Sequence, residues 1–197
     1  MLPREERLDP RKKRTRQLLQ QAFMALLAEK GFPSITVRDI AERATVNRAT
    51  FYAHFADKNA LVDYCIREPF QQMLREKLPA DAKLSAENLQ RLILVVCEFL
   101  AQLHDHCVVP SHDQFAPLVE RQIKAQLYEV LLTWLKGTKS YGPTGYTVPE
   151  LAATVASWAI CGAAWQWSQG DRAGSAQELA RQVLPMINAS LNAQASW

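Results

Sequence analysis

The sequence predicts an all-α fold, with a three-helix helix-turn-helix head followed by a larger helical bundle. Apolar residues recur at spacings of three and four along most of the 197-residue chain, which is typical of amphipathic helices. Ser, Thr, Asp and Asn stand before these runs, where they can cap a helix, and no segment alternates as a strand would. We expect a head over residues 1–56 and a bundle over residues 57–197.

Composition narrows the class of protein. With 48% hydrophobic and 22% charged residues, the chain can bury a sizeable core. The N-terminal segment has no apolar core of a secretory signal, so we expect a cytoplasmic protein. Residues 151–170 carry no charge, but Ala, Gly, Ser and Gln dilute them, which favours a buried interface helix and no membrane span. The four cysteines form no CxxC motif, so reduced thiols are expected.

Helix-capping signals divide the head into short helices. The caps expected at four helix starts are Asp9, Thr36, Asn47 and Asp57, with Asp39 completing a capping box for Thr36. The first helix should end at Gly31, the second near Ala44, and the third should run from Arg48 to Phe55. Two short helices joined by a tight turn predict a helix-turn-helix.

The bundle reads as helices separated by proline and glycine. Breaks are expected at Pro69, Pro79, Pro110 and across residues 137–149, and Pro185 should kink the last helix. Capping boxes at residues 147–150 and 175–178 should start the last two helices.

Charge is unevenly distributed between the two parts. Residues 1–60 hold twelve Lys and Arg against seven Asp and Glu, a net +5, whereas the remainder is −2. This asymmetry favours a polyanionic partner for the head, although a solvated charged face would give the same count.

Residues 36–61 read TVRDIAERATVNRATFYAHFADKNAL, and this run resembles the DNA-binding head of the tetracycline-repressor (TetR) family. The resemblance covers roughly residues 10–65. It implies a homodimer, a second helix of the pair that enters the major groove of double-stranded operator DNA, and a C-terminal domain that responds to a small-molecule effector.

The candidate DNA-binding residues lie on and around the third helix. Asn47 and Arg48 stand at its N-terminus, where free backbone N–H groups favour a phosphate. Arg48 can read guanine, and Ala49 or Thr50 can meet a thymine methyl. The resemblance assigns phosphate contacts to Thr36, Tyr52, His54 and Lys58, and Arg38 adds electrostatic attraction. A solvent-exposed Arg48 and a purely structural Tyr52 and His54 are the alternatives.

Three other residues of the head have structural roles. Phe51 and Phe55 fall on the opposite side of the third helix and should pack into the core. Many relatives carry Gly in the turn where this chain has Thr45, and a β-branched residue is costly at positive φ.

The last two helices are candidates for a dimer interface. Their apolar stripes carry small flanking residues and predict close helix packing between copies, as the resemblance also implies, or else an intramolecular core. The candidate interface residues are Leu151, Val155, Trp158, Gly162, Trp165, Leu179, Val183, Met186 and Ile187.

Two groups of residues are candidates for a ligand site. The candidate effector-pocket residues are Phe99, Phe115, Tyr128, Trp134 and Trp158, which could equally be plain core. His104, His106, Cys107 and His112 could bind zinc, nickel or copper, but a solvated helix end favoured by the helix dipole is the simpler interpretation, so no metal and no cofactor are expected.

The leading hypothesis is a homodimeric transcriptional repressor that binds a palindromic operator and is released by a small molecule. One alternative is a constitutive DNA-binding or architectural module without a pocket. Another is a helical enzyme or metal protein using the histidine cluster, but no phosphate loop, nucleophile elbow, HExxH or paired-carboxylate motif supports it.

Overall fold

The computed structural model describes residues 9–106, 115–137, 148–170 and 174–192, and all regular structure in these ranges is helical. The elements are α1 (Pro10–Lys30), a 3-10 turn η1 (Phe32–Ser34), α2 (Val37–Arg43), α3 (Arg48–His54), α4 (Lys58–Lys77), α5 (Ala86–His106), α6 (Phe115–Lys136), α7 (Val148–Gln169) and α8 (Ala176–Asn192). The predicted all-α fold with an N-terminal helix-turn-helix is confirmed.

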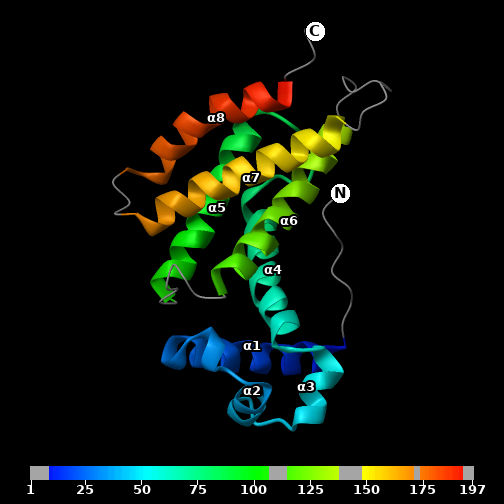
Figure 1. Cartoon of the computed structure of the whole chain (residues 1–197). Coiled ribbons are helices and arrows are strands. Elements are labelled where there is room, and N and C mark those ends of the chain that lie inside the picture. The colour runs from blue at the N-terminus through cyan, green and yellow to red at the C-terminus, as the bar shows by residue number, and fades with distance from the viewer. Residues whose placement is uncertain (1–8, 107–114, 138–147, 171–173, 193–197) are drawn as a thin grey trace.

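The head forms as the capping signals predict. Asp9 accepts a hydrogen bond from the Arg11 backbone N–H at 2.9 Å, and the Asn47 side chain accepts one from Thr50 at 2.6 Å. α1 lies across the end of the molecule, with α2 and α3 beneath it in Figure 1. α3 ends at His54, one residue earlier than expected, because Phe55 is already extended.

The break predicted at Pro69 is wrong, because α4 continues through it. Proline removes one backbone N–H from the helical ladder, but burial of Ile66 and Phe70 on either side keeps the segment helical. The break at Pro79 is confirmed, since α4 ends at Lys77. Pro185 lies within α8.

Other breaks and caps are tested only in part. Pro110, Thr147 and most of residues 137–149 lie outside the described residues. The capping box at the start of α8 is confirmed, because Ser175 N–H donates to the Glu178 carboxylate at 2.7 Å and Glu178 N–H donates to the Ser175 hydroxyl at 3.2 Å.

The body is a helical bundle that α4 connects to the head (Figure 1). α7 packs against α5, α6 and α8, while α4 packs against α5 and α6. A continuous hydrophobic core runs through both parts. The boundary expected between residues 56 and 57 falls just before α4 and stays a prediction, since the core crosses it.

Aromatic rings join the body to the head. Phe115, the first residue of α6, lies with its ring centroid 6.3 Å from that of Phe23 in α1 and 5.9 Å from that of Phe32 in η1. All three rings are buried. The start of α6 therefore forms part of the core of the head.

Among the described helices, none is long and apolar enough to cross a membrane. Cys65, Cys97 and Cys161 are buried, and no disulfide joins these described cysteines. Burial raises the pKa of the Cys97 and Cys161 thiols to about 12, so both stay protonated at neutral pH.

Candidate nucleic-acid interface

The α2–turn–α3 unit is held by short-range contacts. Thr45 in the turn has φ of 56° and donates its backbone N–H to the Glu42 carbonyl at 3.1 Å. On the inner side, Ile40 and Phe51 are fully buried. The expected cost of a β-branched residue at positive φ is therefore present, and the two helices still reach a helix-turn-helix arrangement.

The outer face of α3 carries the candidate base-reading residues. Arg48 and Ala49 are exposed and Thr50 is half-buried, while Tyr52 is 49% exposed. The Asn47 amide oxygen is occupied by the Thr50 backbone N–H and by the Thr50 hydroxyl at 2.9 Å. Asn47 thus serves as the helix cap and keeps its amide NH2 group for an external acceptor.

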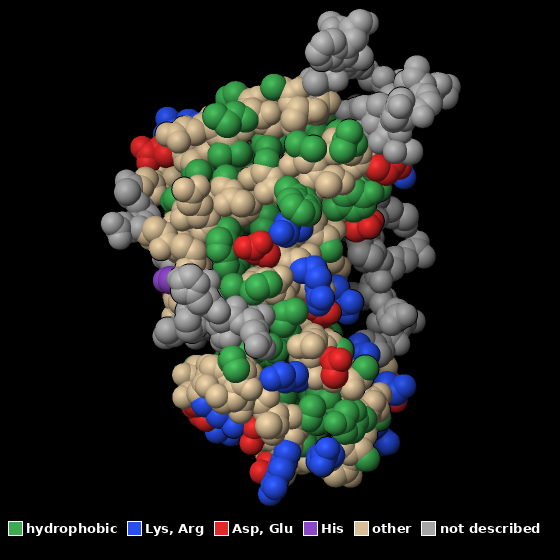
Figure 2. Space-filling model, viewed as in Figure 1, with side chains coloured by type: hydrophobic (Ala, Val, Ile, Leu, Met, Phe, Trp, Pro, Cys, Tyr) green, Lys and Arg blue, Asp and Glu red, His purple; other side chains and the backbone are tan. Residues whose placement is uncertain are grey.

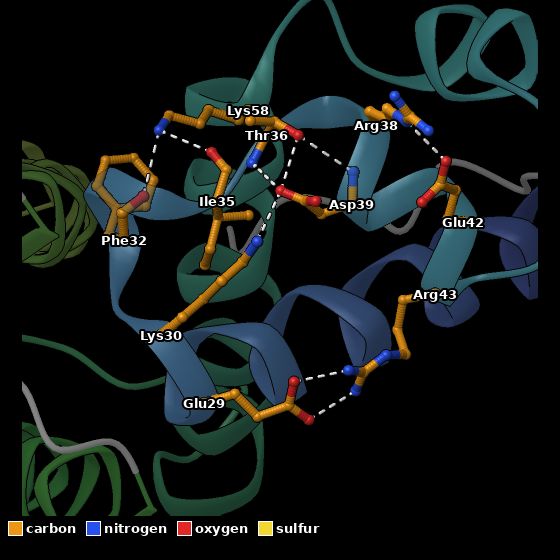
Figure 3. Close-up of polar contacts among 10 residues, drawn as sticks. All are labelled: Glu29, Lys30, Phe32, Ile35, Thr36, Arg38, Asp39, Glu42, Arg43 and Lys58. Carbon is orange, nitrogen blue, oxygen red and sulfur yellow. Dashed lines mark hydrogen bonds and ion pairs between the residues drawn. The ribbon is translucent and has the colours of Figure 1, made fainter.

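A polar network at the start of α2 involves Thr36 (Figure 3). The Thr36 hydroxyl donates to the Asp39 carboxylate at 2.7 Å, and Lys30 pairs with the same carboxylate at 2.8 Å. The Lys30 ammonium and the Thr36 hydrogen bonds hold the pKa of Asp39 well below its usual value. A phosphate contact from Thr36 would require its hydroxyl to turn away from Asp39.

Lys58 has a structural role that the sequence analysis missed. Its ammonium donates to the carbonyls of Phe32 at 3.2 Å and Ile35 at 3.0 Å, and it lies 4.3 Å from the centroid of the Phe32 ring. The first residue of α4 therefore fastens the segment between α1 and α2 (Figure 3). Of the three ammonium hydrogens, two are used in this way.

Two ion pairs flank the same surface. Arg38 donates to Glu42 at 2.7 Å on the exposed face of α2, and this pairing raises the pKa of the Arg38 guanidinium. Arg43 makes a bidentate contact with Glu29 at 2.8 and 2.6 Å, which ties α2 to α1. Glu42 partly neutralises the positive charge expected from Arg38.

His54 lies beside the basic end of α1. Burial, followed by the positive charges of Arg16 and Lys12, lowers the pKa of His54, so its ring is neutral at neutral pH. The Arg16 guanidinium lies 5.8 Å from the Phe55 ring centroid and 5.5 Å from that of Tyr64. Within the described chain its buried Nε has no hydrogen-bond partner.

Comparison with known proteins agrees with this geometry. The sequence pattern of bacterial regulatory proteins of the tetR family matches residues 19–65, from the middle of α1 into α4. Over this segment, the chain is similar to the tetR family. The two curated relatives described next are named as transcriptional regulators.

Two curated relatives show how far the likeness extends. The chain is 27% identical over 180 residues to the HTH-type transcriptional repressor KstR2 of Mycobacterium tuberculosis, which covers 87% of this chain and 89% of that protein. It is 39% identical over 103 residues to the uncharacterized HTH-type transcriptional regulator YxbF of Bacillus subtilis, but this match spans only 27% of YxbF.

Solved structures share the fold of this chain. The fatty acid degradation regulator FadR from Bacillus halodurans superimposes with a TM-score of 0.55 and 19% identity, over 91% of this chain and 99% of that one. FadR from Bacillus subtilis, solved in complex with stearoyl-CoA, superimposes with a TM-score of 0.54 and 18% identity, over 88% of this chain and 98% of that one.

Most of the expected interface residues lie on one apolar face, which we call the α7/α8 face. Leu151 is 66%, Val155 47%, Trp158 62% and Met186 73% exposed. Gly162 is exposed, with open space where a Cβ would stand. Trp165, Leu179 and Val183 are half-buried. Hydrophobic side chains gather over these helices in Figure 2.

One expected interface residue belongs elsewhere. Ile187 is only 2% exposed, so it is part of the core of the subunit. It is one helical step of 100° from Met186, the most exposed of the large apolar residues, and the two therefore face opposite environments.

The five aromatic residues expected in a ligand pocket do not line one cavity. Phe115 packs in the head, and Phe99 packs on Phe70 with ring centroids 5.1 Å apart. Trp134 lines a cavity between α4 and α6. Tyr128 and Trp158 line a surface groove between α6 and α7.

The histidine cluster is only partly described. His104 is exposed at the end of α5, whereas Cys107, His112 and the side chain of His106 lie outside the described residues. Among the residues described, no group of His, Cys, Asp and Glu could hold a metal ion.

Proposed function

We propose that this regulator is a repressor that binds a palindromic operator as a homodimer and releases it when a small molecule binds the body. The observation that carries the proposal is the exposed face of α3, with Arg48 and Ala49 at its start and Tyr52 beyond them, on a head of net charge +5. Operator binding also implies a cytoplasmic location.

The residues on and beside this face have side chains suited to contact with DNA. A guanidinium at Arg48 can take the O6 and N7 acceptors of guanine, while Ala49 and the Thr50 methyl suit a thymine methyl. Tyr52 and His54 can donate to phosphates at the edge of the footprint. The negative charge of an adjacent phosphate would favour protonation of His54 from solvent and so add positive charge that the free protein does not carry.

The α7/α8 face supports a dimer. Leu151, Trp158 and Met186 leave large apolar surfaces in water, and contiguous apolar patches of this kind mark protein interfaces. A second copy would cover the face and set the two heads at a fixed separation. A spacing of about 34 Å would place the α3 helices in successive major grooves.

A movement of the body that releases the operator can reach the head through two contacts. Lys58, at the start of α4, holds the carbonyls before α2, and Phe115, at the start of α6, packs inside the head. A ligand that shifts α4 against α6 would therefore change the angle of the head and, in a dimer, the spacing of the two α3 helices.

Operator selection from genomic fragments tests DNA binding. We expect the wild type to enrich a palindrome and the Arg48→Ala, Tyr52→Ala variant to lose it. Arg91→Ala removes an exposed charge from α5 and serves as the control for charge alone. Repeating the selection across a salt series separates sequence-specific binding from non-specific binding to the DNA phosphates. Equal, sequence-blind binding by all three proteins would reject the proposal.

Sedimentation measures the dimer separately. Leu151→Glu with Met186→Glu should give a monomer that keeps its helical content but loses affinity for the full palindrome, because charges would be buried at the interface. Gln182→Glu adds a charge at an exposed polar site of α8 and should leave the dimer intact. An unchanged oligomeric state in the double variant would contradict the assignment of the α7/α8 face.

A further inference from the structure

A cavity of about 380 Å³ lies between the C-terminal half of α4, the segment after it and α6. Its volume falls within the range of small-molecule sites, roughly 300–1,000 Å³. Much of the wall is apolar, and it includes Leu74, Leu78, Val130 and Trp134. Trp134 is only 6% exposed, so it forms a deep wall of the cavity.

Two amides mark the polar part of this cavity. Gln71 of α4 donates to Gln126 of α6 at 2.7 Å, and both side chains line the cavity and are half-buried. Within the described chain, this bond leaves the Gln71 carbonyl oxygen and the Gln126 NH2 group without a partner. The pair can therefore offer one acceptor and one donor to an occupant.

Charge at the cavity is balanced. Arg75 and Glu129 are the charged residues in its lining and have opposite signs. Arg75 already donates to Gln72 at 3.0 Å. An ionic ligand would lose its water against mostly apolar walls without a net compensating charge, which is unfavourable.

We propose that this cavity is the effector site and that it takes an uncharged, largely apolar ring compound whose single polar group replaces the hydrogen bond between Gln71 and Gln126. This inference rests on the proposed release by a small molecule and names the class of that molecule. Trp134 supplies a flat apolar wall, and the two amides supply orientation.

The position of the cavity gives its occupant control of the head. It separates α4 from α6, and these are the two helices of the body that begin at Lys58 and Phe115. Closer to the head, Arg121 of α6 pairs with Asp63 of α4 at 2.7 Å. Opening the Gln71–Gln126 contact therefore turns the helices about a point that stays tied by this ion pair.

A competing site is the surface groove of about 660 Å³ between α6 and α7. Trp158 on its edge belongs to the α7/α8 face, and Lys124 lies 4.6 Å from the centroid of this ring. A second copy on that face would cover part of the groove. Charged side chains of Glu120, Arg121 and Lys124 also line it, which suits an uncharged ring compound poorly.

Two fluorescent probes with the same ring skeleton test the proposal on the full-length protein without DNA. N-phenylnaphthylamine is uncharged, and anilinonaphthalene sulfonate adds one sulfonate. We expect one N-phenylnaphthylamine to bind per protomer and the sulfonate to bind at least about tenfold more weakly, which corresponds to about 1.4 kcal/mol.

Two exposed alanines provide matched variants. Ala80→Trp fills the mouth of the cavity, and Ala125→Trp adds the same side chain beside the groove. We expect Ala80→Trp to abolish probe binding and Ala125→Trp to leave it unchanged, with both proteins keeping the wild-type circular dichroism spectrum.

Three outcomes would overturn the inference: no binding of the uncharged probe, equal binding of the sulfonate, or loss of binding in Ala125→Trp alone. None of these depends on DNA, so failure here is distinct from failure of operator selection. Conversely, a protein without operator specificity could still show the expected probe binding.

Discussion

Replacing Thr45 by glycine should stabilise the protein. Thr45 is exposed, has φ of 56°, and within the described residues its hydroxyl makes no hydrogen bond. A residue with a Cβ pays roughly 1–2 kcal/mol in the left-handed region. Because the side chain contributes little else, its removal should relieve most of this cost.

The greater flexibility of glycine in the unfolded chain reduces this gain in stability. Glycine loses more conformational entropy on folding, roughly 0.4–1 kcal/mol. The difference predicts that Thr45→Gly raises the free energy of unfolding by about 0.5–1 kcal/mol, equivalent to about 1–4 °C in the melting temperature for a chain of this size.

Urea unfolding at a fixed protomer concentration measures this change, since the stability of a dimer depends on concentration. Thr45→Ala is the matched control, because alanine removes the β-branch and keeps the Cβ. We expect the alanine variant to stay within about 0.5 kcal/mol of the wild type. A Thr45→Gly protein no more stable than Thr45→Ala would refute the argument that positive φ stores the strain.

Three further perturbations follow from the head and its junction with the body. Phe115→Ala should lower the free energy of unfolding by roughly 3–5 kcal/mol in urea titrations, because it removes a buried ring from the core; a loss below about 1 kcal/mol would contradict that packing. Asp39→Asn should lower the urea midpoint at neutral pH, and the gap from the wild type should narrow below about pH 4, because the depressed folded pKa of Asp39 gives a stabilisation that is lost as the carboxylate is protonated. A gap independent of pH would exclude that linkage. For His54, the folded pKa is lowered, so the free protein loses stability as the pH falls below about 6.5; His54→Gln should lessen that loss in urea titrations, and parallel curves for the two proteins would count against it.

Local rules predicted the elements of the head because each cap acts over three residues. Asp9, Asn47 and the Thr36–Asp39 box form hydrogen bonds within their own helix starts, so no knowledge of the fold is needed. Pro69 failed as a breaker because burial of the neighbouring residues compensates a local defect. Rules that consider only neighbouring residues in the sequence do not include the free energy of this burial.

Long-range contacts set the limit of prediction for the site. Lys58 bonds to carbonyls more than twenty residues earlier, and Phe115 packs on rings of α1 and η1. No periodicity indicates which helix another will touch. The apolar stripes of the last two helices predicted the α7/α8 face but wrongly included Ile187. The number of residues that a helix buries depends on how deeply it sits in the bundle, and the sequence does not show that depth.

The burial of Phe115 in the head has a consequence for protein engineering. A chimeric protein could be designed by joining residues 1–56 of this chain to the helical body of another protein. Here a fusion at residue 57 would leave Phe23 and Phe32 facing whatever side chain the foreign α6 presents. A transplantable unit of this head must therefore include the first turn of α6, which is supplied by a part of the chain about sixty residues beyond the fusion point.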